Sequence, residues 1–382
     1  MENVQSKSMK KLEVSQVEEL LKNPDKVVIV QTAPSVRVSL GEMFGGKIGE
    51  KVTGKMVSAL RRIGFRYVFD TDFGADITIW EESQEFLERV KKGGPYPQFN
   101  SCCIGWLSFA DRTFHDFFKD GLISSVKSPI GCLGSVAKTY FADRIGVSPE
   151  NIVVVAVVPC ILKKNENALP YNKTNDLYDV DYCWTTKDLG NLIAERGIDF
   201  NALEDGEFDN PLGESTGGGT IFGRSGGVLE AIIRNAIYFD RKTTLAEDVE
   251  FVPSPLSPDI LDCHFRISGQ EMLACRCGMV GARLIGNLVK EGKCPYHFVE
   301  VMACPGGCIM GAGQPMHLPA EGIPAMEVRR LRTESLNAID HSQEIRICAL
   351  NSSVQKVYDA IYDGKPGSEK AEKALHRRYI HG

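Results

Sequence analysis

Short apolar runs alternate along this chain with longer segments in which apolar and polar residues recur at helical spacing. The first such unit predicts a helix at Val14–Leu21 and a buried strand at Val27–Val30. The next predicts a strand at Tyr67–Phe69, a turn at Asp70–Phe73 and a helix at Ala75–Val90. Strands that are apolar throughout and are separated by helices are typical of parallel sheets covered on both faces. The pattern therefore predicts an α/β fold.

Three further strands are predicted, and cysteines follow each of them closely. The strands are Ile152–Val158, Phe298–Met302 and the short run Tyr96–Phe99. The cysteines that follow them are Cys160, Cys304, and the pair Cys102 and Cys103. Open α/β sheets place their ligand crevice at the carboxyl ends of their strands. We therefore expect thiols that are distant in sequence to meet at one edge of the fold.

The pattern divides the chain into three parts. We predict a helical lead at residues 1–26, a main domain of two lobes with parallel or mixed sheets at 27–328, and a peripheral helical tail at 329–382 that ends in the helical pattern Lys370–Tyr379. Within the main domain, Gly217–Gly227 is a glycine-rich loop before a helix, but it lacks the Gly-Lys-Ser/Thr ending of a P-loop. The loop is either a flexible turn or a place where backbone approaches a compact ligand closely.

Composition narrows the class of protein. The chain has 382 residues, is 43% hydrophobic and carries a formal net charge of −6, which supports a large core and argues against a nucleic-acid partner. No signal-peptide pattern lies in Met1–Lys26, and no apolar run approaches the roughly 20 residues that span a membrane. These observations predict a cytoplasmic protein. In that reducing compartment, 12 cysteines are better explained by metal binding than by disulfides.

Cys304 and Cys308 form the most suggestive motif, because they flank Pro-Gly-Gly directly after a predicted strand. Thiolate is a soft ligand that suits iron–sulfur clusters, zinc and copper(I). Adjacent glycines let backbone amides approach an inorganic sulfide where a Cβ would clash. By itself the spacing leaves a metal site, a disulfide and two inert thiols open.

Taken together, three segments resemble the cluster-binding signatures of the iron–iron hydrogenases. They are Asn100–Trp106, Val158–Glu166 and Glu300–Pro315. The resemblance runs from the Thr32–Ser35 loop, through Gly226–Glu230, to a tail like that family's small subunit. It implies an H-cluster buried between the two lobes: a 4Fe-4S cubane joined through one cysteine to a two-iron subsite with carbonyl, cyanide and azadithiolate ligands. It also implies reversible reduction of protons to dihydrogen.

The resemblance assigns roles to single residues. The implied cubane ligands are Cys103, Cys160, Cys304 and Cys308, the last of which bridges to the two-iron subsite. Four thiolates are what a 4Fe-4S cluster requires. Cys102 resembles the cysteine that exchanges protons with the azadithiolate, Lys163 resembles the lysine that binds a cyanide, and Glu166 closes the same motif and orients its neighbours. The residues that are expected to line the two-iron subsite are Ala33, Pro34, Ser35, Phe222 and Met302.

A proton path is also implied, in the order Glu82, Glu85, Ser124 and Cys102. Glu82 and Glu85 are three residues apart on the predicted helix, so both carboxylates share one face, which Arg89 continues. On the residues alone, such a pair is more often a solvated face, and the resemblance to the family reverses that weighting.

Seven cysteines lie outside this assignment. Four of them suggest a second 4Fe-4S cluster, with zinc or inert buried thiols as alternatives: Cys263, Cys275, Cys277 and Cys294. Cys132, Cys183 and Cys348 show no metal-binding spacing, and we interpret them as structural.

The predicted function is that of a hydrogenase whose electrons come from ferredoxin or a partner subunit, since no ferredoxin-like Cys-x2-Cys-x2-Cys segment precedes the motifs. Maturation proteins would insert the two-iron subsite. Two alternatives are a hydrogen sensor and an iron–sulfur assembly protein. Sensors usually alter the position of Cys102 or carry a signalling domain, and assembly proteins lose much of the first two motifs. Four positions depart from the usual family pattern without removing a ligand: Ile104, Ile130, Val158 and Ala312.

Overall fold

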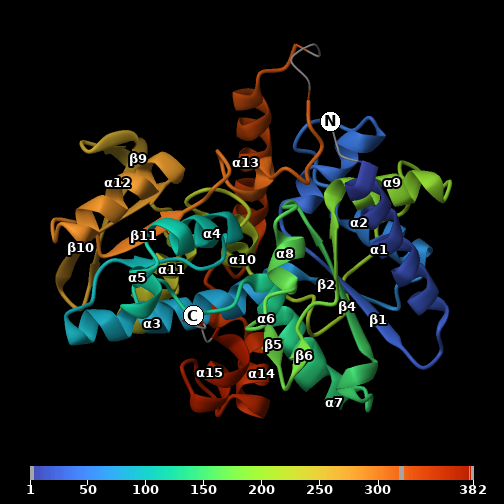
Figure 1. The fold of residues 1–382 in the computed structure, drawn as a ribbon, viewed down its shortest axis with the longest axis horizontal. Helices are drawn as coiled ribbons and strands as arrows, with labels where there is room; N and C mark the ends of the chain where they lie inside the picture. The colour runs from blue at the N-terminus through green and yellow to red at the C-terminus, as the bar shows by residue number, and fades with distance from the viewer. Residues whose placement is uncertain (1–3, 318–321, 378, 380–382) are drawn as a thin grey trace.

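The computed structural model describes residues 4–317, 322–377 and 379. Two main sheets lie at opposite ends of the long axis of the molecule, with helices around and between them (Figure 1). A small hairpin of β5 (Lys173–Thr174) and β6 (Leu177–Tyr178) lies apart from both. The architecture confirms the predicted α/β fold with parallel and mixed sheets. The predicted division into domains stays a prediction.

The first sheet has four parallel strands in the order β2-β1-β4-β7. They are β1 (Val27–Thr32), β2 (Tyr67–Asp70), β4 (Ile152–Val158) and β7 (Tyr182–Thr185). All seven residues of β4 are buried, as expected of a central parallel strand with helices on both faces. This explains why its sequence is apolar without alternation.

The second sheet has five strands in the order β3-β11-β10-β9-β8. They are β3 (Gln98–Phe99), β8 (Val252–Ser254), β9 (Ser257–Ile267), β10 (Gln270–Cys277) and β11 (Phe298–Val301). The strands β3, β11 and β10 are parallel, and β9 and β8 continue the sheet in antiparallel pairing. The carboxyl ends of β3 and β11 therefore lie at the same edge.

The long helix α3 (Thr71–Lys92) carries both glutamates of the predicted proton path. It packs against α6 (Pro129–Val136), α10 (Gly217–Ile221) and α11 (Gly227–Arg241). The predicted turn at Asp70–Phe73 is wrong, because the helix begins there directly. Asp70 ends β2 and caps α3, since its side chain accepts a hydrogen bond from the backbone N–H of Asp72 at 3.0 Å. The helix ends at Gly93, which adopts a positive φ of 74°.

The other helices cover the sheets and form the tail. They are α1 (Val4–Lys22), α2 (Thr53–Ile63), α4 (Ile104–Thr113), α5 (Asp116–Lys119), α6 (Pro129–Val136), α7 (Ala142–Arg144), α8 (Lys163–Asn167), α9 (Thr186–Glu195), α10 (Gly217–Ile221), α11 (Gly227–Arg241), α12 (Met279–Lys290), α13 (Ala325–Ser342), α14 (Ser352–Ile361) and α15 (Glu369–Leu375). The last predicted helix thus ends at Leu375, and His376 is already extended. In the described part of the chain, no helix combines the length and the apolar character that crossing a membrane needs.

Candidate functional site

The loops after β3, β4 and β11 meet between the two sheets. The backbone N–H of Ala303, after β11, donates to Cys103 Sγ, after β3, at 3.4 Å. The backbone N–H of Gly313 donates to the carbonyl of Pro159, after β4, at 2.7 Å. Because β4 belongs to the first sheet and the other two strands belong to the second, the cysteine loops of both sheets face one site.

The four predicted cubane ligands lie together at this site, each as a free and partly exposed thiol. Burial raises the pKa of Cys308 well above its usual value, and the nearby thiols Cys103, Cys160 and Cys304 raise it further. Burial and then Cys103 and Cys160 raise the pKa of Cys304 to about 11. Four converging thiols are the donor set of a cubane iron–sulfur cluster, which binds them as thiolates.

The glycines between Cys304 and Cys308 are required by close backbone packing. Gly306 and Gly307 have φ angles of 95° and 91°. A Cβ at Gly307 would lie 2.4 Å from the backbone nitrogen of Ser225. That nitrogen donates to the carbonyl of Gly306 at 2.9 Å. The glycine-rich loop therefore packs its backbone directly against the cysteine turn.

Asn100 and Lys163 hold the loop of Cys102. The Asn100 side chain donates to Cys102 Sγ at 3.2 Å and accepts from the backbone N–H of Val301 at 2.8 Å, which joins the ends of β3 and β11. Lys163 Nζ donates to the Cys102 carbonyl at 3.0 Å and forms an ion pair with Glu166. Cys102 is buried. Its thiol is thus held beside the four converging cysteines.

A buried arginine of the tail, Arg377, supports this arrangement and was not found from the sequence. Its guanidinium donates to Glu166 at 2.5 Å and to the carbonyl of Ser101 at 3.0 Å. Glu166 also accepts from Ser128 Oγ at 2.7 Å. Burial opposes the charge of Glu166, but Lys163 and Arg377 outweigh burial and lower its pKa. Glu166 is therefore negatively charged and orients the side chain of Lys163 through their ion pair.

The structure brings the predicted proton-path residues together. Glu82 accepts from the backbone N–H of Ser101 at 3.1 Å and from Ser101 Oγ at 3.2 Å. Glu85 accepts from the backbone N–H of Ser125 at 3.2 Å and from Ser125 Oγ at 2.9 Å. Ser124 lies close enough to both carboxyl groups to lower their pKa. Ser101 and Ser125 are contacts that the sequence reasoning missed, although both adjoin predicted site residues.

The two glutamates differ in proton affinity. Burial and then the charge of Glu85 raise the pKa of Glu82 to about 7. Burial acts in the same direction on Glu85, but hydrogen bonding and the charge of His376 outweigh it and lower the pKa of Glu85. A carboxyl group whose pKa is near neutrality can both accept and release protons at physiological pH.

We expect Glu82→Gln to flatten the pH dependence of stability. The raised pKa of Glu82 means that the folded state favours its neutral form. The stabilisation that protonated Glu82 gives the folded state is therefore complete below the ordinary pKa of 4.5 and is lost as the pH rises through about 7. At 1.36 kcal/mol per pKa unit, wild type should lose about 3 kcal/mol relative to Glu82→Gln over this interval. Urea unfolding at about pH 5 and about pH 8 measures this difference. Glu88→Gln, on the exposed face of α3, is the control, and parallel curves for wild type and Glu82→Gln would contradict the expectation.

The residues predicted to line the two-iron subsite, Ala33, Pro34, Ser35, Phe222 and Met302, are all buried. Ser35 Oγ has no hydrogen-bond partner among the described residues. An unpaired buried hydroxyl is costly unless a bound group completes it. This fits a polar ligand beside the Thr32–Ser35 loop.

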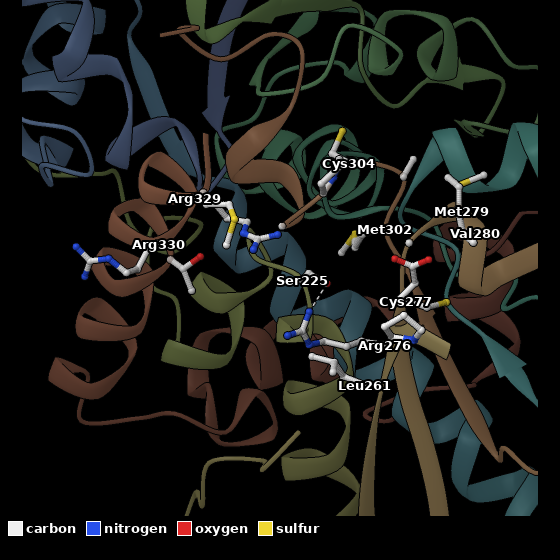
Figure 2. A pocket seen from close by; sticks show the side chains of 18 of the residues that line it. Ser225, Leu261, Arg276, Cys277, Met279, Val280, Met302, Cys304, Arg329 and Arg330 are labelled. Carbon is white, nitrogen blue, oxygen red and sulfur yellow. Dashed lines mark hydrogen bonds between the residues drawn. The ribbon is translucent and has the colours of Figure 1, made fainter. Parts of the chain in front are cut away.

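A cavity of about 1050 Å³ borders Cys304 and Met302 (Figure 2). Its wall carries Arg276, which donates to Ser225 Oγ at 3.1 Å (the dashed line in Figure 2). Arg329 and Arg330 of α13 line the opposite part. The edge of the cysteine site can therefore be reached from the protein surface through this cavity.

Comparison with known proteins decides the family. Residues 26–312 match the family described as iron only hydrogenase large subunit, C-terminal domain. The chain belongs to the iron-only hydrogenase family. Residues 326–381 match the iron hydrogenase small subunit, so the tail of this hydrogenase-family chain also has a known counterpart. Both matches confirm the resemblance that the motifs indicated.

Relatives of two kinds are similar to this chain. The NADP-reducing hydrogenase subunit HndD of Solidesulfovibrio fructosivorans is 42% identical over 96% of this chain, which spans 62% of that protein. The chain thus covers about three fifths of the length of this curated hydrogenase. A solved structure of the FeFe-hydrogenase HydA(deltaEFG), concerned with stepwise H-cluster assembly, has a TM-score of 0.84 and 31% identity, covering 96% of this chain and 98% of its own. The cytosolic Fe-S cluster assembly factor narfl of Danio rerio is 32% identical over 93% of this chain and 86% of its own length.

The four extra cysteines of this hydrogenase-family chain do not form one group. Cys275 and Cys277 share one face of β10 and belong to the core that also contacts Cys294. Cys263 pairs with Ala274 in the antiparallel register, so it points to the opposite face of the sheet and lies in the other core. The predicted four-cysteine accessory cluster is therefore corrected: strand register separates Cys263 from the other three.

We expect Cys263→Ser to leave the iron and sulfide content unchanged. Its thiol lies on the opposite face from the cysteines with which it would have to share a cluster. Iron and acid-labile sulfide analysis of the purified variant checks this, with Cys160→Ser as the control that should lose iron. A fall of about four iron atoms in Cys263→Ser would contradict the register argument.

Proposed function

We propose that this chain catalyses the reversible reduction of protons to dihydrogen at an iron–sulfur H-cluster. One observation carries the proposal: four thiols, a fifth, buried cysteine and a half-buried lysine converge at the ends of strands from two sheets, next to the buried Glu82 and the half-buried Glu85. A structural metal site needs the thiols alone. The additional acid–base groups favour a redox site that also handles protons.

The cysteines would hold the cluster. Cys103, Cys160, Cys304 and Cys308 would ligate the cubane, with Cys308 shared with the two-iron subsite. When bound, the H-cluster supplies electrons and the iron at which protons and dihydrogen interconvert. Ala33, Pro34, Ser35, Phe222 and Met302 would enclose the two-iron subsite and exclude bulk water, and Ser35 would donate its unpaired hydroxyl to a cluster ligand. Lys163, oriented by Glu166, would stabilise an anionic cyanide.

Proton transfer is the task of Cys102 and the glutamates. The thiol of Cys102 lies next to the ligand Cys103 and is electrostatically coupled to Glu82. A proton would pass between Glu85 and Glu82 by way of Ser124, and between Glu82 and Cys102. Glu82, Ser124 and Cys102 are buried, which keeps the transferred proton from exchanging with bulk water between them, whereas Glu85 at the outer end of the path is partly exposed.

Electrons would arrive at the cubane from the side of Cys304, where the cavity reaches the surface (Figure 2). Ferredoxin or an electron-transfer subunit is the proposed donor, and maturation proteins would insert the two-iron subsite. A cytoplasmic location also stays a prediction.

The alternatives are a hydrogen sensor and an assembly protein, the latter because of the relative narfl. The retained Cys102 favours the enzyme over the sensor, and the pair Glu82 and Glu85 favours it over an assembly protein, which has no need of a path for protons.

Hydrogen evolution with reduced methyl viologen tests the proposal. The cubane is reconstituted in the purified chain, and one half of the sample is then matured with the two-iron subsite. Turnover only in the matured half is expected. A matured sample that contains the subsite but shows no turnover would refute the enzymatic role, and slow turnover together with a hydrogen-dependent response would favour the sensor.

A further inference from the structure

The tail returns to the proton path at His376. After α15 ends, the backbone N–H of Arg377 donates to the carbonyl of Ser125 at 2.6 Å, and that of Lys127 donates to the carbonyl of Leu375 at 2.7 Å. His376 thus pairs with Val126 in an isolated antiparallel bridge. These backbone contacts fix the imidazole beside α3.

Both ring nitrogens of His376 contact acid–base groups. Nδ1 lies 2.8 Å from Ser125 Oγ, which donates to Glu85 at 2.9 Å. Nδ1 is also 3.5 Å from a Glu85 oxygen. Nε2 lies 3.1 Å from a carboxylate oxygen of Glu81. The imidazole therefore connects Glu85, on one side, with a second carboxylate on the other.

A cavity of about 420 Å³ reaches the same histidine from outside, and Glu85 and Ser125 also line it. Its rim carries the exposed side chains of Glu88, Glu369, Glu372 and Lys373. A predominantly acidic rim attracts protonated species from solution. Water in this cavity can thus exchange protons with His376 without crossing the apolar core.

Arg89 is less suited to exchange protons, although it continues the same face of α3. Its guanidinium donates to the carbonyl of Pro95 at 3.2 Å and to that of Gly121 at 2.6 Å. Arginine stays charged in proteins and cannot cycle between proton donor and acceptor. An imidazole can gain a proton at one nitrogen while it releases another.

The charges that face His376 keep it protonated. These charges belong to Glu81 and Glu85 of α3, to Glu372 and Lys373 of α15, and to Arg377, the next residue in the chain. Burial opposes the charged ring, but the hydrogen bonds to Glu81 and Glu85 outweigh burial and raise the pKa of His376 to about 10. At neutral pH the ring therefore carries a proton on each nitrogen.

We propose that His376 exchanges protons between the solvent cavity and Glu85 through Ser125, an inference that rests on the proposed hydrogenase function. In hydrogen evolution, Nδ1–H gives its proton to Ser125 Oγ while the Ser125 hydroxyl proton passes to Glu85. Glu85 becomes neutral, Ser125 is regenerated and the imidazole is neutral. Water or a buffer acid in the cavity then restores the imidazolium. One proton and no electrons move in the cycle, and hydrogen oxidation reverses each step.

The test compares His376→Gln and His376→Ala with His264→Gln, which replaces an exposed histidine of β9 outside this cavity. All are matured, and their infrared spectra establish equal cluster content. We expect hydrogen evolution at least about tenfold slower in both His376 variants, with a larger solvent deuterium effect, and unchanged in His264→Gln. Added imidazole should restore the rate of His376→Ala. Wild-type rates in His376→Gln, or a slow His376→Ala that imidazole does not restore, would overturn the proposal.

A second measurement needs no histidine variant. Nuclear magnetic resonance of ¹³C-labelled histidine in the wild-type chain, carrying the oxidised cubane alone, reports the charge of His376. We expect an imidazolium throughout the neutral range and a lower pKa after Glu85→Gln, whereas a neutral ring at neutral pH would overturn the proposal. If the matured wild-type protein is inactive but His376 is charged, the hydrogenase function is refuted, while the protonation of His376 stands as described.

Discussion

Replacing Cys102 with alanine is expected to slow hydrogen turnover by about 10² to 10⁴-fold while leaving the cluster in place. Cys102 lies next to a predicted ligand, and Asn100 donates to its sulfur at 3.2 Å. Alanine removes the only group that joins Glu82 to the cluster in the proposed path, and it removes no ligand. Turnover with reduced methyl viologen and iron analysis of the same sample measure both effects.

Cys183→Ala is the matched control, because it removes a buried thiol of β7 that lies outside the proposed path. The control should keep its turnover. Turnover of Cys102→Ala within a factor of two of the control would show that protons reach the cluster by another route. Loss of iron in Cys102→Ala would instead make Cys102 a ligand.

Replacing Cys308 with alanine is expected to have the largest effect on the cofactor. Cys308 is coupled to all three of the other predicted ligands and is the proposed bridge to the two-iron subsite. Its loss leaves three thiolates for a cubane that requires four. The variant should lose the two-iron subsite, most of its cubane iron and all turnover.

Iron and sulfide analysis after identical reconstitution measures this loss. Cys183→Ala again serves as the control and should match wild type, because its thiol is packed in the main apolar core and is not one of the proposed ligands. A Cys308→Ala variant that keeps four iron atoms per chain would exclude Cys308 as a cubane ligand.

The sequence predicts well the strands and cysteine loops that form the site, because each of them is indicated by a short stretch of residues. Continuous apolar runs of the length of Ile152–Val158 are typical of buried parallel strands, and the loops that follow the carboxyl ends of such strands lie at one edge of the sheet. The turn predicted at Asp70–Phe73 fails for an equally local reason. Asp70 is both the last residue of a strand and a helix cap, so no separate turn is needed.

Long-range contacts are what the sequence does not reveal. Cys275 and Cys277 show their shared face by their spacing, but the face of Cys263 depends on its pairing with Ala274 across β9 and β10. His376 meets Ser125 across 251 residues of sequence, and Arg377 meets Ser101 across 276. A lone histidine in a charged tail resembles a surface residue until the fold places it against α3.

The most direct test is infrared spectroscopy of the anaerobically purified and matured chain in the carbonyl and cyanide stretching region, recorded with and without hydrogen. We expect bands of both ligands that shift when hydrogen is added, because the proposed site holds a redox-active two-iron subsite next to Cys308. Absence of these bands in a sample with complete cubane iron and a maturation system proven on another hydrogenase would contradict the proposed function.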